Sequence, residues 1–162
     1  MAWGDFASAD YAADTPGRQE RGDYLSERDR ILAGRPFTIE NFAEASTTAA
    51  DWTTDAADFY VRTPDYAVPG WFLHGRVYIK VAAGTGGMIR LSNTTDSNDG
   101  TAQTGISSAV WIWSDDLSVQ VDAGPHTDIN VKVQIQGDGA NLMYTHLFSA
   151  TYNYGSFWWE PS

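Results

Sequence analysis

The chain of 162 residues carries 10 lysines and arginines against 21 aspartates and glutamates, a formal net charge of −11. So acidic a surface repels phosphate-bearing partners, because affinity for nucleic acids and anionic membranes depends on basic side chains; we therefore expect neither partner. The absence of cysteine excludes a disulfide framework, a thiolate nucleophile and a zinc finger. With seven Trp, eight Tyr, seven Phe and 15 Gly, the composition favours strands and turns and excludes a helical bundle.

Residues 1–22 are polar, small and turn-prone, with isolated aromatic side chains at Trp3, Phe6 and Tyr11. Their spacing fits neither a helix nor a strand. The segment is either a disordered tail or an extended anchoring arm whose three aromatics occupy pockets of a partner protein, and we favour the arm. The first residues lack a basic and an apolar signal region, so we expect synthesis in the cytosol without a signal peptide.

Residues 23–36 predict one short helix and a linker. Asp23 can cap the first turn through its carboxylate, and apolar side chains then recur at helical spacing. Gly34 and Pro36 end the helix. Such a helix can plug the bottom of the following domain or dock on a neighbouring molecule, and its sequence does not choose between the two.

Residues 37–162 show the pattern of strands separated by turns. Between residues 129 and 135 apolar and polar residues alternate strictly, the period of a half-buried strand. Residues 71–82 and 88–91 flank a glycine-rich turn and predict a hairpin, with a bulge near Gly75.

A second tight turn, Ser114-Asp115-Asp116, is expected between strands at 109–113 and 117–121. Together with candidate strands at 37–39, 58–62 and 142–154, and with Phe157-Trp158-Trp159 after them, these segments give about eight strands at regular spacing. We therefore predict a mostly β domain over residues 37–162. Its expected form is an antiparallel two-sheet sandwich, jelly-roll-like, preceded by the extended arm and the short helix.

The sequence shows no nucleophile elbow, phosphate loop or dinucleotide fingerprint. The three histidines, His74, His126 and His146, have no ligand partner at metal spacing. Asp115 and Asp116 occupy the predicted turn, where aspartate is favoured for backbone hydrogen bonding. We predict no catalytic residue, no metal and no cofactor, and hence a protein that is not an enzyme.

The excess of aromatic residues has three explanations, of which the core and a subunit interface are favoured over a sugar-binding platform. The candidates for an interface lie near the C-terminus: Tyr152, Tyr154, Phe157, Trp158 and Trp159. A sugar platform would combine exposed rings with nearby polar side chains. Its candidates are Trp111 and Trp113, which point to one face of their strand, and the loop residues Asp96, Asn98 and Asp99.

The organisation of the whole chain resembles that of small virion proteins of tailed bacteriophages, among them head decoration proteins and jelly-roll components of head or tail fibres. The stretch Trp71–Asn93 looks like the hairpins of such trimeric jelly rolls. The resemblance implies a structural protein of the virion, made in the host cytoplasm and anchored to capsid or tail by its N-terminal arm. Its partners would be other virion proteins and further copies of itself, with a trimer favoured. The alternative is a carbohydrate-binding module or a receptor-binding, lectin-like domain.

Overall fold

The computed structural model describes the β domain apart from a few short gaps, that is, residues 37–38, 44–64, 70–83, 86–146, 148–149, 153–154 and 156–160. The predicted arm (1–22) and the predicted helix and linker (23–36) lie outside the described residues. The described part consists of strands and connecting turns. None of its residues forms a helix long and apolar enough to cross a membrane.

The strands follow one another along the chain in fifteen segments. They are β1 (Phe37–Thr38), β2 (Ala45–Thr47), β3 (Thr54–Arg62), β4 (Trp71–Arg76), β5 (Tyr78–Val81), β6 (Gly87–Asn93), β7 (Asn98–Asp99), β8 (Gln103–Ile106), β9 (Ile112–Trp113), β10 (Leu117–Val121), β11 (Asp128–Gln136), β12 (Met143–His146), β13 (Phe148–Ser149), β14 (Asn153–Tyr154) and β15 (Ser156–Glu160).

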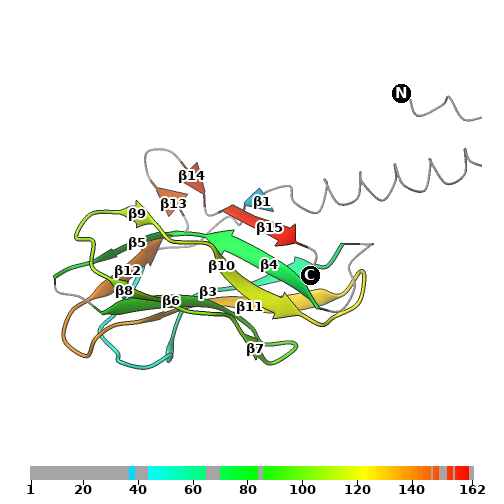
Figure 1. The fold of residues 1–162 in the computed structure, drawn as a ribbon, viewed down its shortest axis with the longest axis horizontal. Helices are drawn as coiled ribbons and strands as arrows, with labels where there is room; N and C mark the ends of the chain where they lie inside the picture. Colours follow the sequence, from blue (N-terminus) through cyan, green and yellow to red (C-terminus); the bar gives the residue numbers. More distant parts are fainter. Residues whose placement is uncertain are drawn as a thin grey trace, which may run out of the picture.

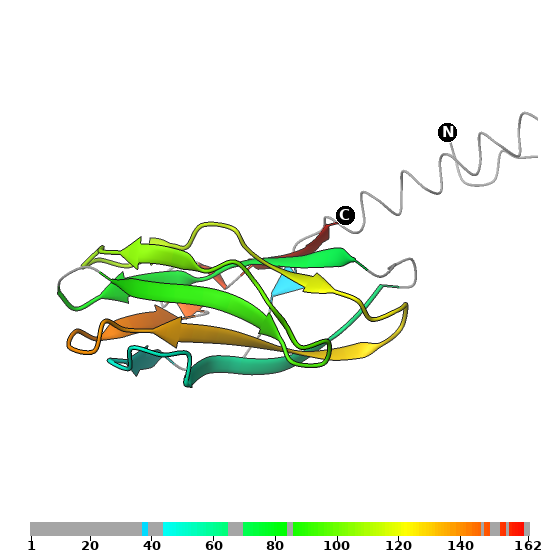
Figure 2. The same cartoon turned by 60° about the horizontal axis from the view of Figure 1, so that its bottom comes forward.

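Apart from the short β13-β14 pair, the strands form two layers (Figure 1). One layer holds the β11 sheet, ordered β3-β11-β6-β7 with β8 also paired to β6. The other holds the β4 sheet, ordered β1-β15-β4-β10, and the β5 sheet, ordered β2-β12-β5-β9. The β4 sheet and the β5 sheet are continuous with each other, because only Val77 separates β4 from β5. Figure 2 shows the same strands from a view turned about the horizontal axis.

The order of strands is that of a jelly roll. Within the described residues, several segments continue one another and form eight long strands. In the layer of the β4 and β5 sheets, the first long strand (β1, β2) lies beside the last (β15, β12). The third (β4, β5) follows, and the sixth (β10, β9) lies at the edge. In the opposite layer the second strand (β3) lies beside the seventh (β11), followed by the fourth (β6) and the fifth (β7, β8). The predicted antiparallel, jelly-roll-like sandwich is therefore confirmed.

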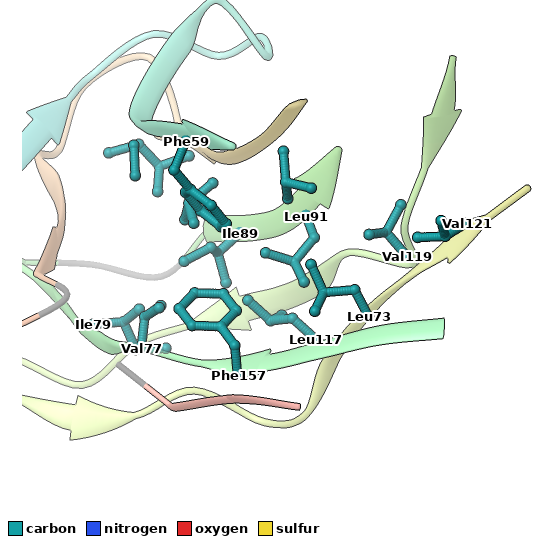
Figure 3. Packing of buried hydrophobic residues seen from close by; sticks show 14 of the residues in the cluster. Phe59, Leu73, Val77, Ile79, Ile89, Leu91, Leu117, Val119, Val121 and Phe157 are labelled. Carbon is teal, nitrogen blue, oxygen red and sulfur yellow. The ribbon is translucent and has the colours of Figure 1, made fainter. Parts of the chain in front are cut away.

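The core lies between the layers and follows from alternation along each strand. In β11 every second residue is buried, from Ile129 to Ile135. The Phe157 ring of β15 meets the Phe59 ring of β3 across the sandwich, edge to face, with centroids 5.3 Å apart (Figure 3). Each fully buried apolar side chain of this kind contributes about 1.5–3 kcal/mol of stability.

Two predicted hairpins are wrong. β5 pairs with β12 and β9, whereas β6 pairs with β11, β7 and β8, so the glycine-rich segment between β5 and β6 crosses from one layer to the other. Likewise β9 pairs with β5 and β10 with β4, so residues 114–116 continue a strand and do not reverse it. A local turn signal does not distinguish a hairpin from a crossing, because a strand buries its apolar face equally well in either layer.

The strand interruption predicted near Gly75 lies two residues later, at Val77. Gly75 itself is inside β4, opposite Phe157 of β15. A Cβ atom at Gly75 would lie 2.6 Å from two carbons of the Phe157 ring. The glycine is therefore required for the ring to sit directly on the backbone of β4.

We expect Gly75→Ala to lower the free energy of unfolding by roughly 1–3 kcal/mol, because the added methyl group overpacks the core against the Phe157 ring. Urea unfolding followed by tryptophan fluorescence measures the loss. Gly124→Ala is the matched control, since a Cβ at Gly124 meets nothing within 4 Å. Equal stability of the Gly75→Ala variant and the parent protein would contradict this packing.

Candidate functional site

The outer face of the β5 sheet carries a cluster of aromatic and basic side chains. Alternation produces it: in β5, Ile79 and Val81 are buried in the core, so Tyr78 and Lys80 face outward. β12 repeats the pattern, with Met143 and Thr145 buried and their neighbours turned outward. We call this cluster the aromatic surface and define it as Tyr78, Lys80, Trp111, Trp113, Tyr144 and His146.

Strand register arranges the aromatic surface in two rows across the sheet. In one row Tyr78 lies between Trp113 of β9 and His146 of β12. In the other row Lys80 lies opposite Tyr144 of β12. The ring of Trp111 completes that row, because the Nζ of Lys80 lies 4.5 Å from its centroid. Three separate stretches of the chain thus build one surface, held in place by a hydrogen-bonded sheet.

Direct contacts fix these side chains relative to one another. The rings of Tyr78 and Trp113 stack with centroids 3.9 Å apart and planes at 29°. The Nζ of Lys80 also lies 4.7 Å from the centroid of the Tyr144 ring. Both distances from the Lys80 Nζ, to the Trp111 ring and to the Tyr144 ring, are within the range of cation–π attraction, about 6 Å. The surface is therefore ordered before any ligand arrives.

Exposed apolar side chains also gather at the edge of the sheet that carries the aromatic surface. Trp111 is 36% and Trp113 is 37% exposed; Ile112 and Val110, which alternate with them along the chain, are 40% and 69% exposed at the same edge. The one other large hydrophobic side chain exposed in the described part of the chain is Tyr60, at 75%, in β3 of the other layer. Contiguous exposed apolar side chains of this kind mark ligand or partner surfaces, whereas single ones are ordinary.

The structure brings together part of the predicted glycan set. Trp111 and Trp113 join the aromatic surface, but Asp96, Asn98 and Asp99 lie around β7, in the other layer (Figure 1). The Asp96 carboxylate accepts hydrogen bonds from the Asn93 side chain, at 2.7 Å, and from a backbone N–H just beyond β10, at 2.9 Å. Asp96 and Asn98 thus brace the end of β10, and Asp99 bonds to Ser92 and Arg90 of β6.

The predicted interface residues near the C-terminus do not form one surface either. Phe157 and Trp159 are 0% and 6% exposed and belong to the core, because they occupy the inward positions of β15. Trp158 lies on the outer face of the β4 sheet, stacked on His74 with centroids 5.4 Å apart. Tyr154 is in β14, and Tyr152 lies outside the described residues.

The histidines occupy separate places. The Nε2 of His74 lies 3.3 Å from the Glu160 carboxylate, His126 is in a turn, and His146 belongs to the aromatic surface. Within the described residues there is no group of three or more acidic or histidine side chains that could hold a metal ion.

Sequence reasoning missed Tyr78, Lys80, Tyr144 and His146 as members of this site. Each occupies a position that alternates with a buried neighbour, so their outward orientation could be predicted. Their proximity could not, because it depends on β12 and β9 pairing with opposite edges of β5.

No protein-family model matches the chain, and no curated protein matches it. Among solved structures, the C-terminal domain of EclA, described as a sugar-binding protein, is similar over 68% of this chain and 79% of that one. The identity is 11% and the TM-score is 0.40. At that level the similarity supports no statement about this chain.

The turn that leads into β12 is held by Asp138. Its carboxylate accepts hydrogen bonds from the side chain of Asn141, at 2.8 Å, and from the backbone N–H groups of Asn141 and Ala140, at 2.6 and 2.9 Å. These bonds, that of the Asn141 side chain first, lower the pKa of Asp138 to about 2. The charged carboxylate thus holds the turn of residues 138–141, which directly precedes β12.

We expect Asp138→Ala to destabilise the protein at neutral pH, with a difference from the parent that shrinks as the pH falls from about 4 to about 2. The folded-state pKa lies below the ordinary value of 3.8, so the carboxylate stabilises the fold above that value and its contribution is lost as it is protonated. Urea midpoints measured between pH 7 and pH 2 test this. Asn141→Ala removes one of the three donors and should show a smaller effect; a difference that persists at pH 2 would contradict the role of the charge.

Proposed function

We propose that the protein is a non-enzymatic binding module that recognises carbohydrate through the aromatic surface of the β5 sheet. The observation that carries the proposal is the ordered, exposed cluster of rings on one outer sheet face, with Trp111 and Trp113 at its edge. Sugar rings present flat CH faces, which pack on aromatic rings through dispersion and the removal of apolar area from water. Hydroxyl groups at the rim of the sugar remain solvated or meet polar side chains.

The position of the rings on a sheet favours binding, because little order has to be created when a ligand arrives. Tyr78 and Trp113 already stack on each other, and Lys80 already contacts two rings. Lys80 and His146 supply hydrogen-bonding groups beside the rings. Apolar and polar contacts thus lie together, which is the combination that a sugar requires.

An interface between copies of the chain is the competing use of such a surface. Lysine is depleted from the buried centres of protein interfaces, because a charge removed from water there needs a partner. Lys80 lies in the middle strand of the aromatic surface, between the rings of β9 and β12. A solvated sugar leaves that ammonium group hydrated, which favours the carbohydrate over a second subunit.

We expect Trp113→Ala and Trp111→Ala each to weaken glycan binding by about tenfold, the loss of one aromatic contact. A glycan array identifies the ligand, and titration followed by tryptophan fluorescence gives the affinity of each variant. Tyr60→Ala is the matched control, because its ring is equally aromatic and more exposed but lies on the other layer. We expect it to bind as the parent does.

Two results would overturn the proposal. The first is an array on which the parent protein binds no glycan. The second is a ligand whose affinity is unchanged in both tryptophan variants and reduced in Tyr60→Ala, which would move the site to the other layer.

A displayed component of a phage virion is the second candidate function, and it is compatible with the first. The observation that favours it is the place where the described chain begins: β1 belongs to the β4 sheet, whereas the aromatic surface belongs to the β5 sheet. An attachment through residues before Phe37 would therefore lie at the half of this layer that does not carry the aromatic surface.

In that role, replacing Trp3, Phe6 and Tyr11 together by alanine should abolish incorporation into particles without unfolding the sandwich. The three rings supply the affinity of the arm, whereas the core of the described part is built from residue 37 onward. Incorporation is measured by immunoblotting of purified particles, and the urea midpoint of the variant is the control. Normal incorporation of the triple variant would contradict the anchoring role.

A further inference from the structure

Lys80 differs from the other basic residues of the described chain in having no acidic partner. The other four are each paired with a carboxylate: Arg62 with Asp128, Arg76 with Asp116, Arg90 with Asp99, and Lys132 with Asp55. Within the described residues, no carboxylate oxygen lies within 4 Å of the Lys80 ammonium. In a chain with a net charge of −11, an ammonium group without a carboxylate is the exception.

The surroundings of Lys80 are aromatic. Its Nζ lies 4.5 Å from the centroid of Trp111 and 4.7 Å from that of Tyr144. The two rings hold the ammonium group in place and remove part of its hydration. Partial removal of water strengthens its attraction for an external anion, because the charge is less screened than on an open surface.

We propose that the aromatic surface binds hexuronate oligosaccharides, whose ring carboxylate pairs with Lys80 while the sugar rings pack on the aromatic side chains. This inference rests on the proposed carbohydrate-binding function and names its substrate class. The ligand has to combine a flat, apolar ring face with a negative charge carried on the same ring. A pyranose with a carboxylate on its ring meets both requirements.

The shape of the surface favours a uronate chain over a terminal acidic sugar. The rings form two rows that cross β9, β5 and β12, with Lys80 in the central strand. A chain of pyranose rings can lie along such rows and bring a carboxylate to the middle of the surface. A terminal sialic acid, by contrast, would contact one ring and leave most of the surface uncovered.

The net charge of the protein does not prevent this pairing. None of the ion pairs among the described residues involves Lys80, and charges farther apart than about 8 Å are largely screened at physiological ionic strength. Asp116, which follows β9 along the chain, is already paired with Arg76. Within the described residues, the Lys80 ammonium is therefore not neutralised by an ion pair.

The test compares oligogalacturonate with its methyl ester, in which the same sugar chain carries no charge on its carboxyl groups, on the full chain. We expect the parent protein to bind the oligogalacturonate about fivefold more tightly than the ester, the upper range for a partly exposed ion pair. Lys80→Gln should bind both forms equally, and Lys80→Arg should keep the preference because it keeps the charge. Urea midpoints of both variants verify that the sandwich is intact.

Salt provides an independent measurement. Raising the NaCl concentration should weaken binding of the oligogalacturonate and leave binding of the ester nearly unchanged, since only the former includes an ion pair. Calorimetric titrations at two salt concentrations measure both affinities.

The outcomes separate this inference from the function on which it rests. Equal binding of acid and ester by the parent protein, an unchanged preference in Lys80→Gln, or tighter binding of sialylated glycans would each overturn the uronate assignment and leave carbohydrate binding in place. Binding of no glycan of any kind would overturn both.

Discussion

Two hydrogen bonds between Val77 and Ser114 join the two halves of one layer, the β4 sheet and the β5 sheet. The backbone N–H of Val77 donates to the Ser114 hydroxyl, at 3.1 Å, and the backbone N–H of Ser114 donates to the Val77 carbonyl, at 2.8 Å. Both residues are buried, where an unpaired peptide group costs about 1–3 kcal/mol. Because the bonds bridge the break, β5 and β9 stay paired beyond it, and the aromatic surface depends on that pairing.

The alternation of apolar and polar residues makes many strands and their buried faces predictable, but it does not show which strands pair with each other. The strict pattern of β11 identifies a strand, its face and its buried residues without further information. The pairing of β5 and β6 could not be predicted in this way, because a glycine-rich segment can connect two strands of one sheet or two strands in different layers. Gly75 is a similar case: its reason for being glycine is the Phe157 ring, which is distant in sequence and arrives only through the pairing of β15 with β4.

In the candidate site, too, the orientation of side chains along one strand is predictable from the sequence, whereas their proximity across strands is not. Neighbours on one strand, Trp111 and Trp113, can be recognised from the sequence as facing one way. Their association with Lys80 and Tyr144 depends on two pairings across β5 that no local pattern encodes. Asp96 shows the converse: as a polar residue in a loop it suggests a sugar contact, but its carboxylate is occupied in bracing β10.

A comparison of the two outer faces explains why the aromatic surface is the better candidate for binding. On the β11 sheet the charges satisfy one another: burial would raise the pKa of Asp55, but hydrogen bonds from Lys132 and Gln134 outweigh it and lower that pKa. A ligand there would have to replace existing ion pairs and would gain little. On the β5 sheet the partly exposed groups are aromatic side chains and an ammonium group that pairs with no carboxylate of the described residues, so a ligand that supplies an apolar face and a negative charge has no ion pair to replace.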